Sequence, residues 1–295
     1  MKVRFAVAPE RSSLPGAEIL AFADALEASG FDAAWLSDLP VAPALDPLLG
    51  LALIAARTSR LKLGANVVPL GRNPFLLAKS LAQLDQLSAG RLLLSFVPGV
   101  DQPGEREALG LRDAKRGAVL EESLGLLRAW WAGEAVEHHS ERWSFTGLTA
   151  PVVPLQDPLE VWMGGRAPSA LERVGRLADG WLGAMLTPVE ARAARERIQE
   201  SAERAGREID PEHFGLSIAY ARGAPPEDFV ATMRARRADV DPLELVPSGA
   251  AALRTLIERH IDAGLSKFVV RPALAVASWE DEVGWLAATI LDLQS

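Results

Sequence analysis

Residues 61–99 contain a strand, a helix and a second strand in close succession, and this unit limits the possible folds more than any other stretch. Residues 61–68 and 92–97 are apolar at most positions, as is typical of parallel strands that are covered on both faces. Four leucines between residues 77 and 87 recur at helical spacing and predict an apolar stripe that packs on a sheet. The stretch therefore predicts a β-α-β unit with parallel strands.

Signals at both ends of the helix support this interpretation. Asn73-Pro74 suits a helix start, and Gly90 can adopt the left-handed conformation that ends a helix. Asn66 is the exception in the first strand, because its side chain is polar near the strand's carboxyl end. Parallel α/β proteins usually place ligand contacts at such ends, so Asn66 is a candidate binding residue.

The alternation of strands and helices continues along the whole chain. The predicted strands are residues 3–8, 33–37, 61–68, 92–97, 160–163, 181–186, 215–220 and 267–270. Eight strands with intervening helices fit a closed (β/α)8 TIM barrel better than an open doubly wound sheet. We therefore expect the α/β class and one barrel domain over residues 1–295, with residues 132–158 as an inserted excursion between strands four and five.

Charge and cysteine content exclude several classes of protein. The net charge of −8 opposes a nucleic-acid-binding or anionic-membrane-binding surface, since phosphate groups require a basic face. The absence of cysteine excludes thiol nucleophiles, disulfides and thiolate metal sites, and with four histidines we expect no metal site. The apolar run at the N-terminus stops at Pro9, which is too short for a signal peptide, so we predict a cytoplasmic protein.

Polar residues and glycines recur at the predicted carboxyl ends of the strands. In a barrel these ends share one rim, so the residues would surround one pocket. They are Asp38, Asn66, Gly99, Asp101, Gly164, Gly165, Arg166, Tyr220 and Arg271. Each also has a purely structural explanation, because Asp38 could cap its loop and Arg166 or Arg271 could pair with surface carboxylates.

Gly164-Gly165-Arg166 lies between the fifth strand and a helix. Free backbone amides, the helix dipole and a guanidinium together can bind a phosphate group. A tight turn with a solvent-facing arginine explains the same residues equally well. These residues alone therefore leave both interpretations open.

Five ordered segments resemble the bacterial luciferase-like flavin-dependent oxidoreductases, a family of (β/α)8 barrels that use FMN or the deazaflavin F420. The segments are GFDAAWLSD at residues 30–38, LGANVVPL with RNP at 63–74, LDQLSAGR at 84–91, VWMGG at 161–165 and LADGW at 177–181. They span most of the chain. The resemblance implies a small-molecule substrate and makes a homodimer plausible, while the net charge given above predicts no nucleic-acid or membrane partner.

The resemblance also assigns roles to individual residues. It implies a bulge at the end of the third strand, often with a non-proline cis peptide, beneath the flavin ring at Asn66-Val67. Asp38 matches the acidic position beside that ring. The cofactor-binding residues implied are Asp38, Ala65, Asn66, Val67, Val97, Gly99, Gly164, Gly165, Arg166 and Ala167. The last four of these match the segment that binds the phosphate of the cofactor.

One departure from the family pattern concerns the proton donor. Many F420-dependent members have a histidine after the Ser-Asp pair, and Leu39 occupies that position here. The candidate catalytic residues are therefore Asp38, Asp101 and Tyr220, with Glu105 as a further possible proton donor.

Three functional hypotheses follow from these observations. The leading one is an oxidoreductase that uses F420 for hydride transfer to or from a small organic substrate. The first alternative is an FMN-dependent luciferase-like monooxygenase that uses O2. The second is a non-catalytic flavin-binding barrel, which Leu39 and the scarcity of histidines would fit.

Overall fold

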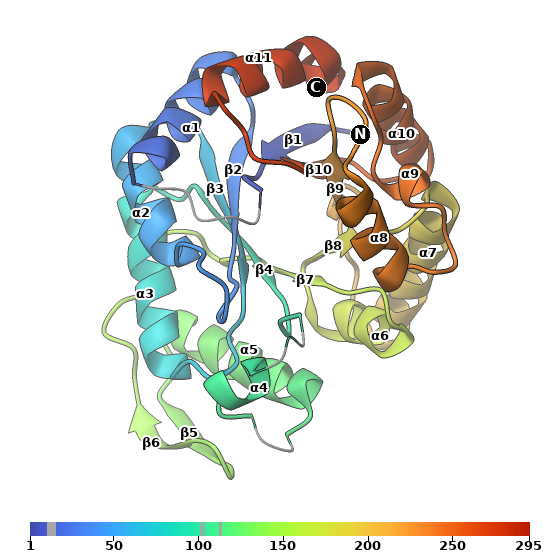
Figure 1. Ribbon diagram of the computed structural model, residues 1–295. Coiled ribbons are helices and arrows are strands. Elements are labelled where there is room, and N and C mark those ends of the chain that lie inside the picture. The colour runs from blue at the N-terminus through green and yellow to red at the C-terminus, as the bar shows by residue number, and fades with distance from the viewer. Residues whose placement is uncertain (11–15, 101, 103, 112–113) are drawn as a thin grey trace.

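Eight parallel strands close into a barrel in the computed structural model, which describes residues 1–10, 16–100, 102, 104–111 and 114–295 (Figure 1). Around the barrel the strands follow the order β1-β10-β9-β8-β7-β4-β3-β2. They are β1 (Arg4–Val7), β2 (Ala33–Ser37), β3 (Lys62–Val67), β4 (Leu92–Phe96), β7 (Val161–Gly164), β8 (Gly180–Ala184), β9 (Phe214–Tyr220) and β10 (Lys267–Pro272). The predicted (β/α)8 TIM barrel is confirmed.

Helices surround the barrel on its outer side (Figure 1). The helices of ten or more residues are α1 (Gly16–Ser29), α2 (Pro47–Arg57), α3 (Pro74–Leu87), α5 (Arg116–Trp131), α6 (Pro168–Leu177), α7 (Pro188–Arg204), α8 (Glu227–Arg236), α10 (Ala250–Asp262) and α11 (Trp279–Ile290). The shorter ones are α4 (Glu105–Ala108), α9 (Pro242–Leu245) and a final 3-10 turn (Leu291–Leu293). Helices α4 and α9 were not expected from the sequence, because each is a single turn without a periodic apolar pattern.

The β3-α3-β4 unit forms as predicted. The Asn73 side chain caps α3, since its Oδ1 accepts hydrogen bonds from the backbone amides of Phe75 and Leu76 at 3.0 and 3.1 Å. After the helix, Ala89 and Gly90 both have positive φ angles, of 56° and 76°, and turn the chain into β4. Polar caps and a glycine therefore fix both ends of this helix.

The side chains of each strand alternate between the barrel interior and the layer under the helices. On β4, Leu92, Leu94 and Phe96 are buried under the helices. On β2, Trp35 faces inward and packs in a small inner cluster with Leu182 of β8 and other side chains. This alternation decides which residues at the strand ends can reach a ligand.

The predicted excursion forms a hairpin of β5 (Val136–His139) and β6 (Ser144–Leu148). Its Phe145 ring packs edge-to-face on Trp130 of α5, with ring centroids 5.0 Å apart. The following segment is attached to α3, because the buried carboxylate of Asp85 accepts hydrogen bonds from the amides of Leu155 and Gln156 at 2.8 and 2.9 Å. The excursion is therefore a packed part of the barrel's outer surface.

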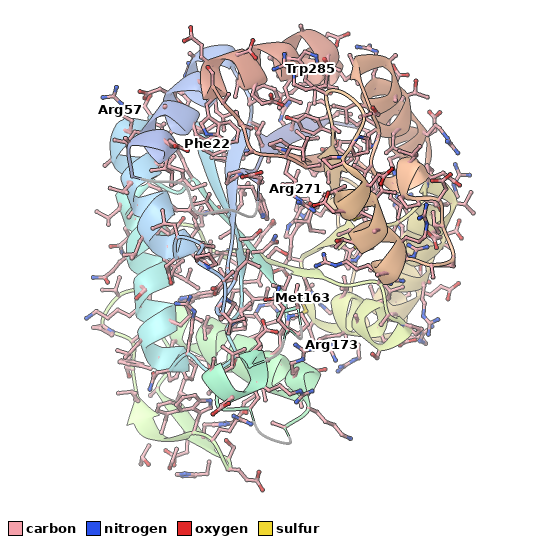
Figure 2. All side chains as sticks on the ribbon, viewed as in Figure 1. Phe22, Arg57, Met163, Arg173, Arg271 and Trp285 are labelled. Atoms are coloured by element: carbon pink, nitrogen blue, oxygen red, sulfur yellow. The ribbon has the colours of Figure 1, made fainter. Side chains whose placement is uncertain are left out.

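Arginine side chains illustrate the two environments of the fold. Figure 2 shows Arg57 on α2 at the outer surface and Arg271 of β10 within the ring of helices. Among the described residues, no helix is long and apolar enough to cross a membrane.

Candidate functional site

A pocket of about 340 Å³ opens at the carboxyl ends of the barrel strands. The position matches the usual place of active sites in this architecture, and the volume lies within the range of small-molecule pockets. Its lining includes Ala8, Ser37, Asn66, Val97, Gly164, Ala184, Ser217 and Arg271, which lie on or just after the eight barrel strands. The structure thus brings distant strand-end residues together as the sequence predicted.

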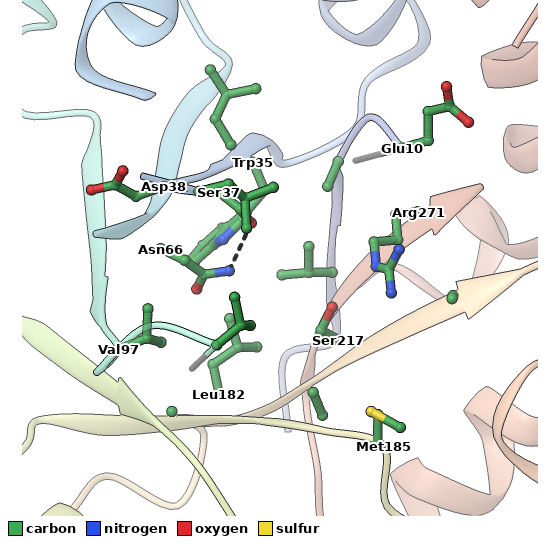
Figure 3. A pocket seen from close by; sticks show the side chains of 18 of the residues that line it. Glu10, Trp35, Ser37, Asp38, Asn66, Val97, Leu182, Met185, Ser217 and Arg271 are labelled. Atoms are coloured by element: carbon green, nitrogen blue, oxygen red, sulfur yellow. Dashed lines mark hydrogen bonds between the residues drawn. The ribbon is translucent and has the colours of Figure 1, made fainter. Parts of the chain in front are cut away.

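Asn66 and Ser37 form a polar pair on one wall of this pocket (Figure 3). The Asn66 amide Nδ2 donates to Ser37 Oγ at 3.0 Å, so the orientation of both side chains is fixed. Trp35 lines the same wall, and its side chain is only 6% exposed. Its indole Nε1 is buried without a hydrogen-bond partner among the described residues, and such a group is costly unless a ligand or solvent satisfies it.

The expected bulge with a cis peptide at Asn66-Val67 is wrong. Strand β3 pairs in regular register through this point, with Asn66 opposite Ser95 and Val67 opposite Phe96. Within the described chain, the cis peptide found is Asp157-Pro158. Both neighbouring strands hold β3 straight, because the Asp38 amide donates to the Asn66 carbonyl at 2.8 Å and the Val97 amide to the Val67 carbonyl at 3.0 Å.

Asp38 lines the pocket, but its carboxylate is directed away from Asn66 (Figure 3). Its Oδ2 accepts from the Val68 amide at 3.1 Å and from Arg72 Nη2 at 2.9 Å. The same Arg72 nitrogen donates to Asp46, the N-cap of α2, at 2.9 Å. Burial raises the pKa of the Asp38 carboxyl, and Arg72 and the Val68 amide offset only part of that shift. The geometry therefore makes Asp38 an anchor of the pocket wall.

Val97 and Gly99 line the pocket after β4, next to the Asn66 wall, and a buried carboxylate supports their loop. Glu105 is 1% exposed and accepts hydrogen bonds from the amides of Val100 and Gln102 at 3.3 and 3.2 Å. A side chain on Gly99 would collide with Glu105, because its Cβ would lie 2.5 Å from Oε1. The predicted catalytic residue Asp101 belongs to this loop and lies outside the described residues.

Gly164 and Gly165 contribute backbone to the pocket lining. A Cβ on Gly164 would lie 3.0 Å from Val97 Cγ1, and Gly165 has a φ of 117°, which disfavours other residues. The Gly165 carbonyl accepts from Trp181 Nε1 at 2.9 Å. Helix α6 begins at Pro168, beyond the last lining residue of this segment, and its N-cap Ala167 makes no side-chain cap. The Ala167 carbonyl accepts from the Ala170 and Leu171 amides at 2.8 and 3.0 Å.

Five predicted residues lie outside the pocket lining. Arg166 and Ala167 are exposed beyond the glycines. Ala65 and Val67 are fully buried under the helices, because they flank the inward-facing Asn66 on the strand. Tyr220 points to α11, where its hydroxyl donates to Glu282 Oε1 at 2.7 Å.

The environment of Tyr220 makes it a poor proton donor. Burial, together with the neighbouring Glu282 carboxylate, raises the pKa of Tyr220. Its ring also stacks on Trp285, with centroids 5.5 Å apart. The structure therefore gives Tyr220 a structural contact with α11.

Other pocket residues were not found from the sequence. Ser217 could have been recognised, since it is a polar residue at an inward position of an apolar strand. The residues of α8 and α9 that form another wall show no comparable sequence pattern. They are Met233, Arg236, Leu245 and Val246.

A family model and two similar proteins were found by comparison with known proteins. A model of the luciferase-like monooxygenase family matches residues 2–278. The 5,10-methylenetetrahydromethanopterin reductase of Methanolobus tindarius is 30% identical over 208 residues, which cover 70% of this chain and 61% of that protein. The F420-dependent glucose-6-phosphate dehydrogenase of Nakamurella multipartita is 28% identical over 223 residues, with 70% and 64% covered. The matches thus span less than two thirds of these two relatives.

A solved structure supports the fold assignment. The coenzyme F420-dependent tetrahydromethanopterin reductase from Methanopyrus kandleri superposes with a TM-score of 0.81 and covers 100% of both chains. The sequences are 19% identical, so this likeness shows a shared fold.

Proposed function

This chain belongs to the luciferase-like monooxygenase family, and from that premise we propose that it is an oxidoreductase whose pocket binds the deazaflavin F420. The reaction would be hydride transfer to or from a small organic substrate. The observation that carries the proposal is the joint placement of the Asn66–Ser37 pair and the Gly164-Gly165 segment in one pocket. Relatives that use F420 favour this cofactor over FMN.

The pocket residues fit such a cofactor. Gly164 and Gly165 bring backbone to the pocket surface, and Trp35 offers a buried indole donor that lacks a partner among the described residues. When bound, the deazaflavin would supply the atom that accepts or donates the hydride. The protein would bind the ring on the Asn66 wall and exclude water, while the backbone of Gly164-Gly165 would lie beside the rest of the cofactor.

Asn66 provides a direct test. Replacing Asn66 with alanine is expected to weaken F420 binding about tenfold, because one fixed donor to the ring and the bond to Ser37 are both lost. Fluorescence titration of the purified protein with F420 and, separately, with FMN measures both affinities. Gln83→Ala, an exposed change on α3, serves as the control and should leave binding unchanged.

The outcome also decides between the three functional hypotheses. Tight FMN binding without F420 binding would support an FMN-dependent monooxygenase. Cofactor binding without turnover of any acceptor would favour a non-catalytic flavin-binding barrel. Steady turnover of reduced F420 with an acceptor would exclude that third hypothesis.

We also propose that the protein is a homodimer and is cytoplasmic. Support for the dimer comes from the outer face of α2 and α3, where Leu49, Leu53 and Leu76 are 64%, 45% and 59% exposed. The exposed positions of α2 from residue 49 to residue 56 carry no charged side chain. Contiguous apolar helix faces of this kind usually mark interfaces.

A charge on this face tests the dimer. Leu53→Glu is expected to raise the dimer dissociation constant at least about tenfold, since a carboxylate would be buried without a partner. Sedimentation velocity over a range of concentrations measures the change. Val189→Glu is the matched control, because Val189 is 76% exposed on α7, away from α2 and α3. A wild-type protein that stays monomeric at all concentrations would contradict the proposal.

A further inference from the structure

Met185, the first residue after β8, has an unusual backbone conformation for a residue with a large side chain. Its φ angle is 59°, in the left-handed region that residues other than glycine, asparagine and aspartate rarely adopt. Met185 lines the pocket, and Figure 3 shows its side chain among those around the cavity. A rarely populated conformation at a pocket wall indicates a functional constraint on that residue.

The Met185 side chain borders an apolar side of the pocket. Ala219 of β9, Met233 of α8 and the Leu245-Val246 pair at the end of α9 form one buried cluster. Met185 is partly buried and packs against this cluster. All five residues line the pocket. A ligand that fills this side would therefore gain its binding free energy mainly from the burial of apolar surface.

The backbone of Met185 is bound by a buried arginine. Arg237 directly follows α8 and is 2% exposed. Its Nη1 donates to the Met185 carbonyl, its Nη2 donates to Glu190 Oε1 at 2.7 Å, and its Nε donates to Asp239 Oδ1 at 2.9 Å. Because the guanidinium is planar and two carboxylates hold it, the direction of the donor to Met185 is fixed.

The same ion pair connects Met185 to the start of α7. Glu190 forms a capping box with Thr187, since its Oε2 accepts from the Thr187 amide at 2.8 Å and Thr187 Oγ1 accepts from the Glu190 amide at 3.3 Å. The other carboxylate oxygen of Glu190 binds Arg237. One group of side chains therefore holds both ends of the connection between β8 and α7, and this group imposes the conformation of Met185.

We propose that Met185 determines how long an apolar group of the substrate can be, and that Arg237 is the positioning residue that holds Met185 in place. The proposal rests on the proposed oxidoreductase function and names a specificity determinant of the same pocket. The Met185 side chain occupies space beside the apolar cluster that a longer ligand would fill. Methionine has a flexible side chain, so a fixed backbone is needed to keep its thioether in one place.

Straight-chain alcohols from butanol to decanol test this limit through their displacement of the neutral fluorescent probe 1-aminoanthracene. In the wild type the affinity should rise about fourfold with each methylene until the chain fills the apolar side, and then level off. Met185→Ala removes the atoms beyond Cβ, so it should extend this rise by about two carbons and bind the longest alcohols about tenfold more tightly. Leu243→Ala is the matched control, because Leu243 is 54% exposed on α9 and is not part of the pocket lining.

The role of Arg237 is tested in two backgrounds. Arg237→Gln should bind the longest alcohols about threefold more tightly, because the flexible Met185 side chain is no longer held in place. In the Met185→Ala background the same replacement should leave the alcohol profile unchanged, since no long side chain remains to be displaced. Arg237→Lys keeps the charge beside Glu190 but loses the forked donor to the Met185 carbonyl, so it should behave as Arg237→Gln does and provides a second variant.

Equal alcohol profiles for the wild type and Met185→Ala, or no binding of the probe by the wild type, would overturn the proposal. An equal effect of the Arg237 replacements in both backgrounds would show that Arg237 supports the wall as a whole and does not act through Met185. F420 titration of the same samples keeps the two proposals apart. F420 binding with an unchanged profile overturns the role of Met185 alone, whereas failure of both F420 and FMN to bind refutes the proposed function while the alcohols still decide the role of Met185.

Discussion

Replacing Gly64 with alanine is expected to lower the free energy of unfolding by about 3 kcal/mol, at the upper end of the usual cost of overpacking. Gly64 lies on β3 beneath the Trp35 ring, and an added Cβ would lie 1.9 Å from Trp35 Cε3 and 2.5 Å from Cζ3. Trp35 is 6% exposed and packed on other inner side chains, so the ring cannot move away freely. The entropic benefit of removing a glycine, about 0.4 to 1 kcal/mol, is too small to compensate.

Guanidinium denaturation of the wild type and the variant measures this loss. Gly125→Ala is the matched control, because Gly125 is an exposed residue of α5 with nothing within 4 Å of the added Cβ. It should leave the stability unchanged or raise it by up to about 1 kcal/mol. In a Trp35→Phe background, Gly64→Ala should cost clearly less, since the smaller ring leaves space. An equal cost in both backgrounds would show that the steric explanation is wrong.

His260 is expected to make the protein sensitive to mild acid. It is fully buried in α10, and neither ring nitrogen has a hydrogen-bond partner among the described residues. Burial, with a smaller contribution from Arg259, lowers the pKa of His260 from 6.5 to about 4. In the unfolded chain His260 is therefore protonated below about pH 6.5, whereas in the folded protein it is protonated only below about pH 4.

The sign of the effect follows from this lowered pKa. The free energy of unfolding that depends on a neutral His260 is fully present above pH 6.5. It decreases by about 3 kcal/mol in total as the pH falls towards about 4. Carboxylates with a lowered pKa, such as Glu121, add to the acid sensitivity, so the informative quantity is the difference between variants.

The variant His260→Leu isolates the histidine. It should lose less stability than the wild type between about pH 7 and about pH 4.5, and it should be about 1 to 2 kcal/mol more stable at neutral pH because two unsatisfied polar atoms are removed. His139→Gln, at a side chain that is 62% exposed, should follow the wild-type profile. Parallel pH profiles for His260→Leu and the wild type would contradict the assignment.

Local sequence signals predicted the scaffold because they act over a few residues. The helical spacing of the leucines in α3, the Asn73 cap and Gly90 determine one element each, and the structure has this helix at the predicted bounds. Asn66 was identifiable as a candidate because a polar residue in an apolar strand end is a local departure. The alternation of strand side chains then places its neighbours Ala65 and Val67 under the helices.

Features that depend on distant residues were not predictable in this way. The direction of the Asp38 carboxylate is decided by Arg72, which lies 34 residues away. Tyr220 turns to α11 because Glu282, 62 residues later, accepts its hydroxyl. The bulge at Asn66-Val67 was inferred from family resemblance, and the regular pairing on both sides of β3 overrules it here.

The support of the loop after β4 has a consequence for how the pocket can change. Glu105 binds the backbone amides of Val100 and Gln102, so the path of the loop does not depend on the side chains at those two positions. Val100 lines the pocket. Evolution or an engineered library can therefore vary these side chains and reshape the entrance for new substrates, while the carboxylate of Glu105 preserves the backbone that presents them.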